Sequence, residues 1–288
     1  MDWLPHSASR RAAERFGRWF LVCAAMLTMG CQAAQKMAQP SNHRNWEPLY
    51  SQLATAEFVG NDVTIRNVRH CNFMDKESYV PNWYDKKFRL TDIQGVDFIV
   101  MPFPKTPILA HTQLSFELAR PGQPPEHLAV SVETRKEEGE GYAAWKGSAR
   151  QYELIYIVAD ERDAIESQTN VDPRDVYLYR STATPEQAQR LFVDVMSRAN
   201  QLAIRPEFYD TLTNNCTTNI VDHINRIQPR RLTYDLRVLL PGMSDKLAYD
   251  QGLIVRHGTF EETQARAYIT AKAQQHAGRS DFSQLIRR

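Results

Sequence analysis

The sequence predicts an α+β domain in which a mostly antiparallel sheet of about six strands packs against helices. Stretches of alternating apolar and polar residues, rich in β-branched and aromatic side chains, lie between residues 63 and 180. Two amphipathic helical patterns, each with a capping residue at its start, follow after residue 183. Strands that largely precede the main helices are typical of the α+β class.

The composition is that of a globular protein of balanced charge. The chain has 288 residues, of which 42% are hydrophobic, so it can bury a full core. Its 35 Lys and Arg residues oppose 34 Asp and Glu residues, for a formal charge of +1. Nucleic-acid-binding proteins usually concentrate positive charge, so this balance argues against a nucleic-acid partner.

Residues 1–31 are predicted to form a targeting segment. Arginines precede an apolar run at residues 19–30, which is too short to span a membrane comfortably. Cys31 follows Gly30, which resembles the cleavage site of lipoproteins whose cysteine is lipidated, and Gln32 then implies the outer membrane. A signal cleaved near residues 33–34 and an uncleaved anchor are the alternatives. All three place the domain outside the cytoplasm.

The remainder is predicted to be one domain on a tether. Residues 32–45 are rich in Gln, Ala, Lys, Pro and Asn and are expected to be flexible. Residues 46–288 are expected to form a single globular domain with a helical C-terminal extension from about residue 229. The sequence contains no internal repeat.

The expected strands follow one another along the first two thirds of the chain. The loop at residues 119–127 contains three prolines and a glycine, which is the turn chemistry of an antiparallel hairpin between its flanking strands. The expected strands are residues 63–73, 83–90, 96–101, 108–118, 128–135, 152–158 and 175–180.

Two long helices are predicted after these strands. Thr184 followed by Pro185 is a pattern typical of a helix start. The second helix is expected at residues 216–227, with Asn214 or Asn215 as its N-cap. Short helices or turns are expected at residues 234–242 and 247–253, and an amphipathic helix at residues 260–275.

Cys216 is the candidate nucleophile. It opens the helix predicted at residues 216–227, where unpaired N–H groups and the helix dipole favour a thiolate over a thiol. Cys71 is the other cysteine expected in the mature domain, and it has no feature of a reactive thiol. In an oxidising compartment, a disulfide between the two is the competing interpretation.

His111 is the candidate base. On the strand at residues 108–118 it shares the odd-numbered, polar face with Gln113. Glu133 lies on the small and polar face of the next strand, where antiparallel pairing is expected to bring it close to His111. His111 would take the thiol proton of Cys216, and Glu133, or less favourably Gln113, would orient the ring.

The oxyanion of a tetrahedral intermediate is expected to bind the backbone N–H of Cys216 and a side-chain amide of Asn214 or Asn215. Simpler interpretations stay open, with His111 as a hydrogen-bonded core residue and Glu133 as a solvated strand end. The sequence has neither the cysteine spacing of zinc sites nor a glycine-rich phosphate loop, so no metal and no cofactor are predicted.

Several segments resemble the Lnb N-terminal periplasmic domain family of bacteria. They include Ile108-Leu109-Ala110-His111-Thr112 and Asn214-Asn215-Cys216-Thr217-Thr218, and the likeness extends from about residue 63 to the C-terminus. The other segments are residues 67–69, 114–116, 128–137, 150–156 and 160–163. The resemblance gives Cys71 no role.

This resemblance implies an exported bacterial domain. A strand histidine that precedes a helix-opening cysteine is also similar to circularly permuted papain-like (NlpC-type) cysteine hydrolases, which implies a permuted papain-like arrangement with the nucleophile at a helix N-terminus. The expected function is a thiol-dependent hydrolase or acyltransferase, tethered to the periplasmic face of a bacterial membrane and most simply an outer-membrane lipoprotein.

The expected substrates are amides, esters or thioesters of the bacterial envelope, carried by peptidoglycan peptides, lipids or lipoproteins. An exported protein is a further expected partner, because the alternative function is a non-catalytic accessory or chaperone-like protein that binds an exported enzyme.

Overall fold

The structure, a computed structural model, describes residues 39–75, 78–141, 146–147, 150–171, 173–228, 231–233 and 235–288. Contacts divide the chain into two units, Met1–Ser41 and Asn42–Arg288, and every element named below lies in the second. Cys31, with the rest of the expected targeting segment, lies outside the described residues. None of the helices in the described ranges has the length and hydropathy that crossing a membrane requires.

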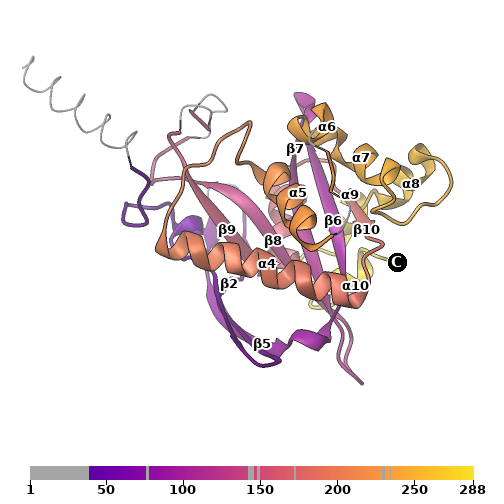
Figure 1. The fold of residues 1–288 in the computed structure, drawn as a ribbon, viewed down its shortest axis with the longest axis horizontal. Coiled ribbons are helices and arrows are strands. Elements are labelled where there is room, and N and C mark those ends of the chain that lie inside the picture. The colour runs from indigo at the N-terminus through magenta and orange to yellow at the C-terminus, as the bar shows by residue number, and fades with distance from the viewer. Residues whose placement is uncertain are drawn as a thin grey trace, which may run out of the picture. The chain divides into compact units, whose positions relative to one another are not determined.

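An eight-stranded mixed sheet lies at the centre of this unit (Figure 1). Its strand order is β1, β2, β9, β8, β7, β6, β10, with β5 paired to β2 outside this path. The β2–β9 pair is parallel, and the other pairs of the sheet are antiparallel. The strands are β1 (Thr55–Val59), β2 (Asp62–Arg69), β5 (Trp83–Arg89), β6 (Ile93–Phe103), β7 (Thr106–Leu118), β8 (Glu126–Arg135), β9 (Glu153–Asp160) and β10 (Tyr177–Arg180), beside a small ribbon of β3 (Asn72–Phe73) and β4 (Tyr79–Val80).

The predicted α+β class is confirmed, and the sheet is larger than the sequence suggested. Beyond the seven strand ranges expected along the chain, the sheet contains β1, which pairs with β2 through a two-residue turn at Gly60 and Asn61. Gly60 has a φ of +60°, a conformation that glycine adopts without steric cost and that such tight turns require.

The even-numbered side chains of the central strands form the main apolar face, and helices α4 (Pro185–Ile204) and α5 (Cys216–Ile227) cover it (Figure 1). Phe192 of α4 packs edge-on against Phe116 of β7, with ring centroids 5.1 Å apart. The predicted start of α4 is confirmed, because the Thr184 side chain accepts a hydrogen bond from the Gln187 N–H.

Shorter helices cover the odd-numbered face of β6. Ile99 and Met101 pack there with Ile165 of α3 (Glu161–Glu166) and Phe282 of α10 (Phe282–Leu285). The remaining helical elements are α6 (Leu236–Leu239), α7 (Ser244–Asp250), α8 (Phe260–Ala267), α9 (Thr270–Gln275), the 3-10 turns η1 (Pro48–Tyr50), η2 (Leu90–Asp92) and η4 (Pro241–Met243), and the π-helical turn η3 (Ser167–Val171).

The prediction of one continuous helix at residues 260–275 is wrong, because the chain forms α8 and α9 with a break between them. At the break, Tyr268 forms a β-bridge with Tyr177, and the Ile269 N–H donates to the Val176 carbonyl at 3.0 Å. Contact with the start of β10 therefore overrides a helical pattern that is continuous in the sequence.

Candidate active site

The candidate site lies where strands β7 and β8 separate. The β7–β8 ladder ends at the pair Gln113 and Ser131, although β7 continues to pair with β6 and β8 with β9. Helix α5 packs against both strands (Figure 1). Its first residue brings the Cys216 Sγ to 4.0 Å from the carbonyl oxygen of Ala110 on β7.

Asn215 is the N-cap of α5. Its Oδ1 accepts from the Thr218 N–H at 2.9 Å, and the Thr218 hydroxyl in return accepts from the Asn215 N–H at 2.8 Å. The Asn215 amide nitrogen also donates to the Thr211 carbonyl at 2.7 Å. This network fixes the loop that leads into Cys216, the first residue of the helix, whose N–H has no acceptor within the helix.

Asn214 has a similar positioning contact. Its amide nitrogen donates to the Phe208 carbonyl, and its Oδ1 accepts from the Asn219 amide, each at 2.9 Å. Both asparagine side chains proposed as oxyanion donors thus donate their amide N–H groups to backbone carbonyls of the loop before α5. The backbone N–H of Cys216 is the donor that the start of the helix offers directly.

His111, Ser131 and Glu133 form a compact cluster across the gap between the strands. The His111 Nε2 lies 3.0 Å from the Glu133 Oε1 and 2.7 Å from the Ser131 Oγ. Ser131 donates its hydroxyl proton to the same Glu133 oxygen at 2.6 Å. Continuing the β7–β8 register by one residue pair on this face places His111 opposite Glu133, as the sequence predicted.

The His111 ring lies close enough to the Cys216 thiol that its hydrogen bond and charge lower the pKa of the thiol. Because Ser131 and Glu133 hold Nε2, the Nδ1 atom is the ring nitrogen left for the thiol. The structure therefore brings together the three residues proposed as nucleophile, base and orienter.

The charges of these groups support one another. Burial raises the pKa of the Cys216 thiol, but the hydrogen bond and charge of His111 outweigh it, and the pKa falls below its ordinary value. Burial lowers the pKa of His111, but the charge of Glu133 and hydrogen bonds with Cys216 and Glu133 raise it to about 10. Burial likewise raises the pKa of Glu133, but His111 and the Ser131 hydroxyl lower it to about 2. The three groups therefore favour one another's charged forms: carboxylate favours imidazolium, and imidazolium favours thiolate.

Gln113 lies behind this cluster. Its side chain is 2% exposed, and its Oε1 has no hydrogen-bond partner within the described ranges. With Ser131 and Glu133 it lines a polar cavity of about 250 Å³. In the described part of the chain, no hydrogen bond joins Gln113 to His111. Its proposed roles in binding substrate or orienting the ring therefore have no direct contact behind them.

Ser131 is the residue that sequence reasoning missed. The sequence placed it on the same face as Glu133, two positions away, but strand alternation does not reveal that its hydroxyl bridges the carboxylate and the ring. Its hydroxyl, on the same strand face two residues before Glu133, was the available signal.

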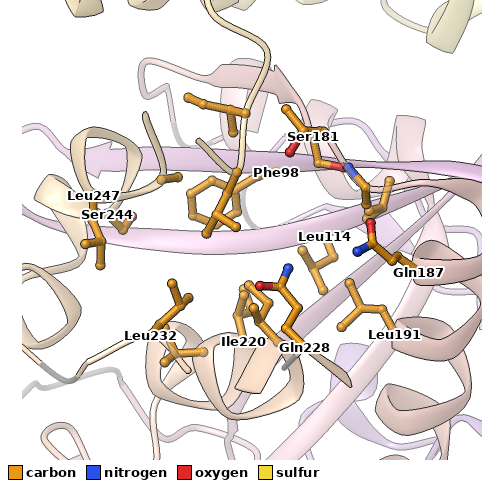
Figure 2. Close-up of a pocket in the computed structure, with 18 of the residues that line it drawn as sticks. Phe98, Leu114, Ser181, Gln187, Leu191, Ile220, Gln228, Leu232, Ser244 and Leu247 are labelled. Atoms are coloured by element: carbon orange, nitrogen blue, oxygen red, sulfur yellow. The ribbon is translucent and has the colours of Figure 1, made fainter. Parts of the chain in front are cut away.

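A larger cavity of about 430 Å³ lies on the α5 side of the sheet (Figure 2). Figure 2 shows Phe98 and Leu114 of the sheet, Ile220 of α5 and Leu247 of α7 around one space. Thr217 also lines it, and its Oγ1 lies 3.9 Å from the Cys216 Sγ. This apolar cavity thus begins one residue from the candidate nucleophile.

Cys71 and Cys216 are both free, buried thiols. The Cys71 N–H donates to Asp163 at 2.6 Å, and burial, together with the Asp163 charge, raises the pKa of the Cys71 thiol to about 12. The described part of the chain places no group of three or more His, Cys, Asp and Glu side chains where they could hold a metal ion.

The sequence model of the Lnb N-terminal periplasmic domain family matches residues 79–242, which is more than half of the chain. The matched region contains His111, Ser131, Glu133 and Cys216. The family is periplasmic, which supports an exported protein with a periplasmic location. Comparison with curated proteins and with solved structures gave no match. The chain belongs to the Lnb N-terminal periplasmic domain family.

Proposed function

We propose that this protein is a thiol-dependent hydrolase or acyltransferase that acts on an amide, ester or thioester of the bacterial envelope. The observation that carries the proposal is the ion pair between the His111 ring and the Glu133 carboxylate, beside a Cys216 thiol whose pKa His111 lowers. This arrangement of nucleophile, base and orienter activates a thiol for attack on a carbonyl carbon.

In the first half-reaction, His111 holds the proton of the Cys216 thiol, and the thiolate attacks the substrate carbonyl. The new S–C bond pushes the carbonyl electron pair onto oxygen, where the backbone N–H of Cys216 stabilises the negative charge. The intermediate collapses with loss of the amine, alcohol or thiol leaving group, which takes the proton from His111. A thioester on Cys216 remains.

In the second half-reaction, His111 takes a proton from the nucleophile that attacks this thioester. If the nucleophile is water, the acid is released, and the protein is a hydrolase. If it is an amine or an alcohol, the acyl group passes to it, and the protein is an acyltransferase. In both cases the S–C bond breaks and the thiolate forms again beside the protonated ring.

Among envelope substrates, the cavity beside Thr217 favours those with an apolar chain. Its walls are mostly aliphatic, with Leu114, Ile220 and Leu247 among them. Burying each methylene group of a ligand contributes about 0.8 kcal/mol, whereas peptidoglycan peptides carry mainly polar groups that such walls leave unpaired. Lipids and lipoproteins are therefore the favoured substrates.

Lipidation of Cys31 would keep this site at the periplasmic face of the outer membrane. Growth with an alkyne-labelled fatty acid should label the full chain and leave a Cys31→Ala variant unlabelled. Equal labelling of the two chains would contradict lipidation at this cysteine. So would a Cys31→Ala variant that, like the wild type, stays bound to the membrane after its signal is cleaved.

A non-catalytic accessory protein is the second candidate. The observation that favours it is the position of Cys216 in the main apolar cluster, where the residue is only 4% exposed. A thiol kept only for packing would be as unreactive as other buried structural cysteines.

Acylation of the purified protein separates the two candidates. Mixing with p-nitrophenyl butyrate should give a burst of p-nitrophenol and a butyryl adduct on Cys216, located by peptide mass mapping. His111→Ala should slow the burst by about 10²- to 10⁴-fold, and Cys216→Ala should abolish it. A folded wild-type protein that forms no adduct would support the accessory role instead.

A further inference from the structure

The apolar cavity follows one face of helix α5 from its first turn to its last. Six α5 positions, spaced by one, three or four residues, line it: Thr217, Ile220, Val221, Ile224, Ile227 and Gln228, the C-cap. At a helical rise of ~1.5 Å per residue, Thr217 and Gln228 lie about 16 Å apart along the axis. We call this elongated space the α5 slot.

The two ends of the α5 slot differ in chemistry. At the near end, the Thr217 Oγ1 lies 3.9 Å from the Cys216 Sγ. Between the ends, Ile220 and Ile224 share the slot with aliphatic side chains of the sheet and of neighbouring helices. At the far end, Gln228 directs its amide toward the space (Figure 2). The apolar space thus runs from Thr217, the residue after the candidate nucleophile, to a polar group at Gln228.

The opposite wall comes from helix α7 and the loop after it. Leu247 is 5% exposed and packs in one apolar cluster with Val221 of α5 and Leu232. Residues beyond 242 lie outside the region that the family model matches. The shape of the α5 slot therefore depends on the C-terminal part of this chain as well as on α5.

We infer that the α5 slot holds one linear acyl chain with its carbonyl at Cys216, and that Ile227 and Gln228 limit the length of chain the protein accepts. The inference rests on the proposed function for the position of the carbonyl. Each methylene that lies against the aliphatic walls improves binding by about fourfold. A chain that reaches Gln228 gains nothing further, because it would bury the amide without a hydrogen-bond partner.

A binding experiment tests this selection without relying on the chemistry. The full chain carrying Cys216→Ala is titrated with saturated fatty acids of increasing length, below their micellar concentrations, by displacement of a fluorescent apolar dye. The affinity should rise by about fourfold per methylene and then reach a plateau. Gln228→Leu should move the plateau to longer chains, and Ile227→Phe should move it to shorter ones.

Ile220→Ala is the matched control, because Ile220 lines the same slot near its other end. It should weaken the binding of fatty acids of every length by a similar factor and leave the chain length at the plateau unchanged. An affinity that does not depend on chain length, or a plateau that neither far-end variant moves, would overturn the inference.

Acylation by p-nitrophenyl esters of the same acids separates this inference from the proposed function. The thiolate forms a bond to the acyl carbon, the aryl ester C–O bond breaks, and p-nitrophenolate leaves. Length-dependent binding without any acyl adduct would keep the slot and reject the enzyme. If acylation rates and binding affinities are both the same for all chain lengths, the proposed enzyme function is supported and the inference about the α5 slot is overturned.

Discussion

The His111 Nε2 lies 3.0 Å from the Glu133 Oε1, at a level of the sheet where strands β7 and β8 no longer pair. The ion pair, with the Ser131 hydroxyl between its partners, joins the two strands in place of backbone hydrogen bonds. One contact therefore contributes both to the stability of the split sheet and to the charge state of the thiol.

Glu133 should stabilise the fold in a pH-dependent manner. Because its folded pKa of about 2 lies below the ordinary 4.5, the carboxylate contributes stability above pH 4.5 that is lost as the pH falls toward 2. Glu133→Gln should lower the free energy of unfolding at pH 7 by about 3 kcal/mol. Urea denaturation at a series of pH values measures the difference from the wild-type protein, which should shrink below pH 4.5.

The control for this prediction is Glu57→Gln, at an exposed position on β1. It should change stability by less than about 0.5 kcal/mol at any pH. A difference between Glu133→Gln and wild type that stays constant from pH 7 to pH 2 would show that the carboxylate is not paired with His111.

Ser131 should act as a positioning residue for the base. Ser131→Ala removes the hydroxyl that contacts both the His111 ring and Glu133, and acylation of Cys216 should slow by about tenfold. The acid limit of the pH–rate profile should also shift to higher pH, because the hydroxyl helps to keep Glu133 ionised.

Ser115→Ala provides the comparison for Ser131. Ser115 is also buried on the odd-numbered face of the sheet, and its hydroxyl donates to Glu161 at 2.5 Å. This variant loses the same kind of hydrogen bond far from the thiol, and its pH–rate profile should match the wild type. If both variants change the profile alike, Ser131 has only a structural role.

The sequence predicts those parts of the fold and site that depend on local patterns. Strand alternation places His111 and Glu133 on matching faces of neighbouring strands, and the capping pattern places Cys216 at the first position of α5. Each of these features follows from residues that are close in sequence, together with one hairpin.

Features that depend on tertiary contacts were not predictable in the same way. The break between α8 and α9 comes from contact with the start of β10, and the α5 slot needs α7 to pack beside α5. The bridging position of Ser131 depends on where β7 and β8 part, which no local pattern marks.

The N-cap of α5 should influence the reactivity of Cys216. Asn215→Ala removes the acceptor for the Thr218 N–H and should cost about 1 kcal/mol of stability. Alkylation of Cys216 in the native protein should slow several-fold, because the first turn that positions the thiol loosens. Thr259→Ala removes the equivalent cap of α8 and should cost similar stability at unchanged thiol reactivity. Equal slowing in both variants would contradict a specific role for Asn215.

The two cysteines of the domain should differ sharply toward alkylating reagents. Burial and the Asp163 charge raise the pKa of the Cys71 thiol to about 12, whereas the pKa of Cys216 is lowered. Brief treatment of the native protein with chloroacetamide, followed by peptide mass mapping, should find Cys216 modified and Cys71 intact. Unfolding without reductant should then expose Cys71 as a free thiol. A peptide linked through both cysteines would contradict this expectation.

The most direct test of the activated thiol is the pH dependence of Cys216 alkylation by chloroacetamide in the native protein. Because His111 lowers the pKa of Cys216, the alkylation rate of the wild-type protein should rise at a lower pH than that of His111→Gln, whose rise should be centred near the ordinary cysteine pKa of about 8.5. A wild-type rate that rises over the same pH range as that of the variant would contradict activation of Cys216 by His111.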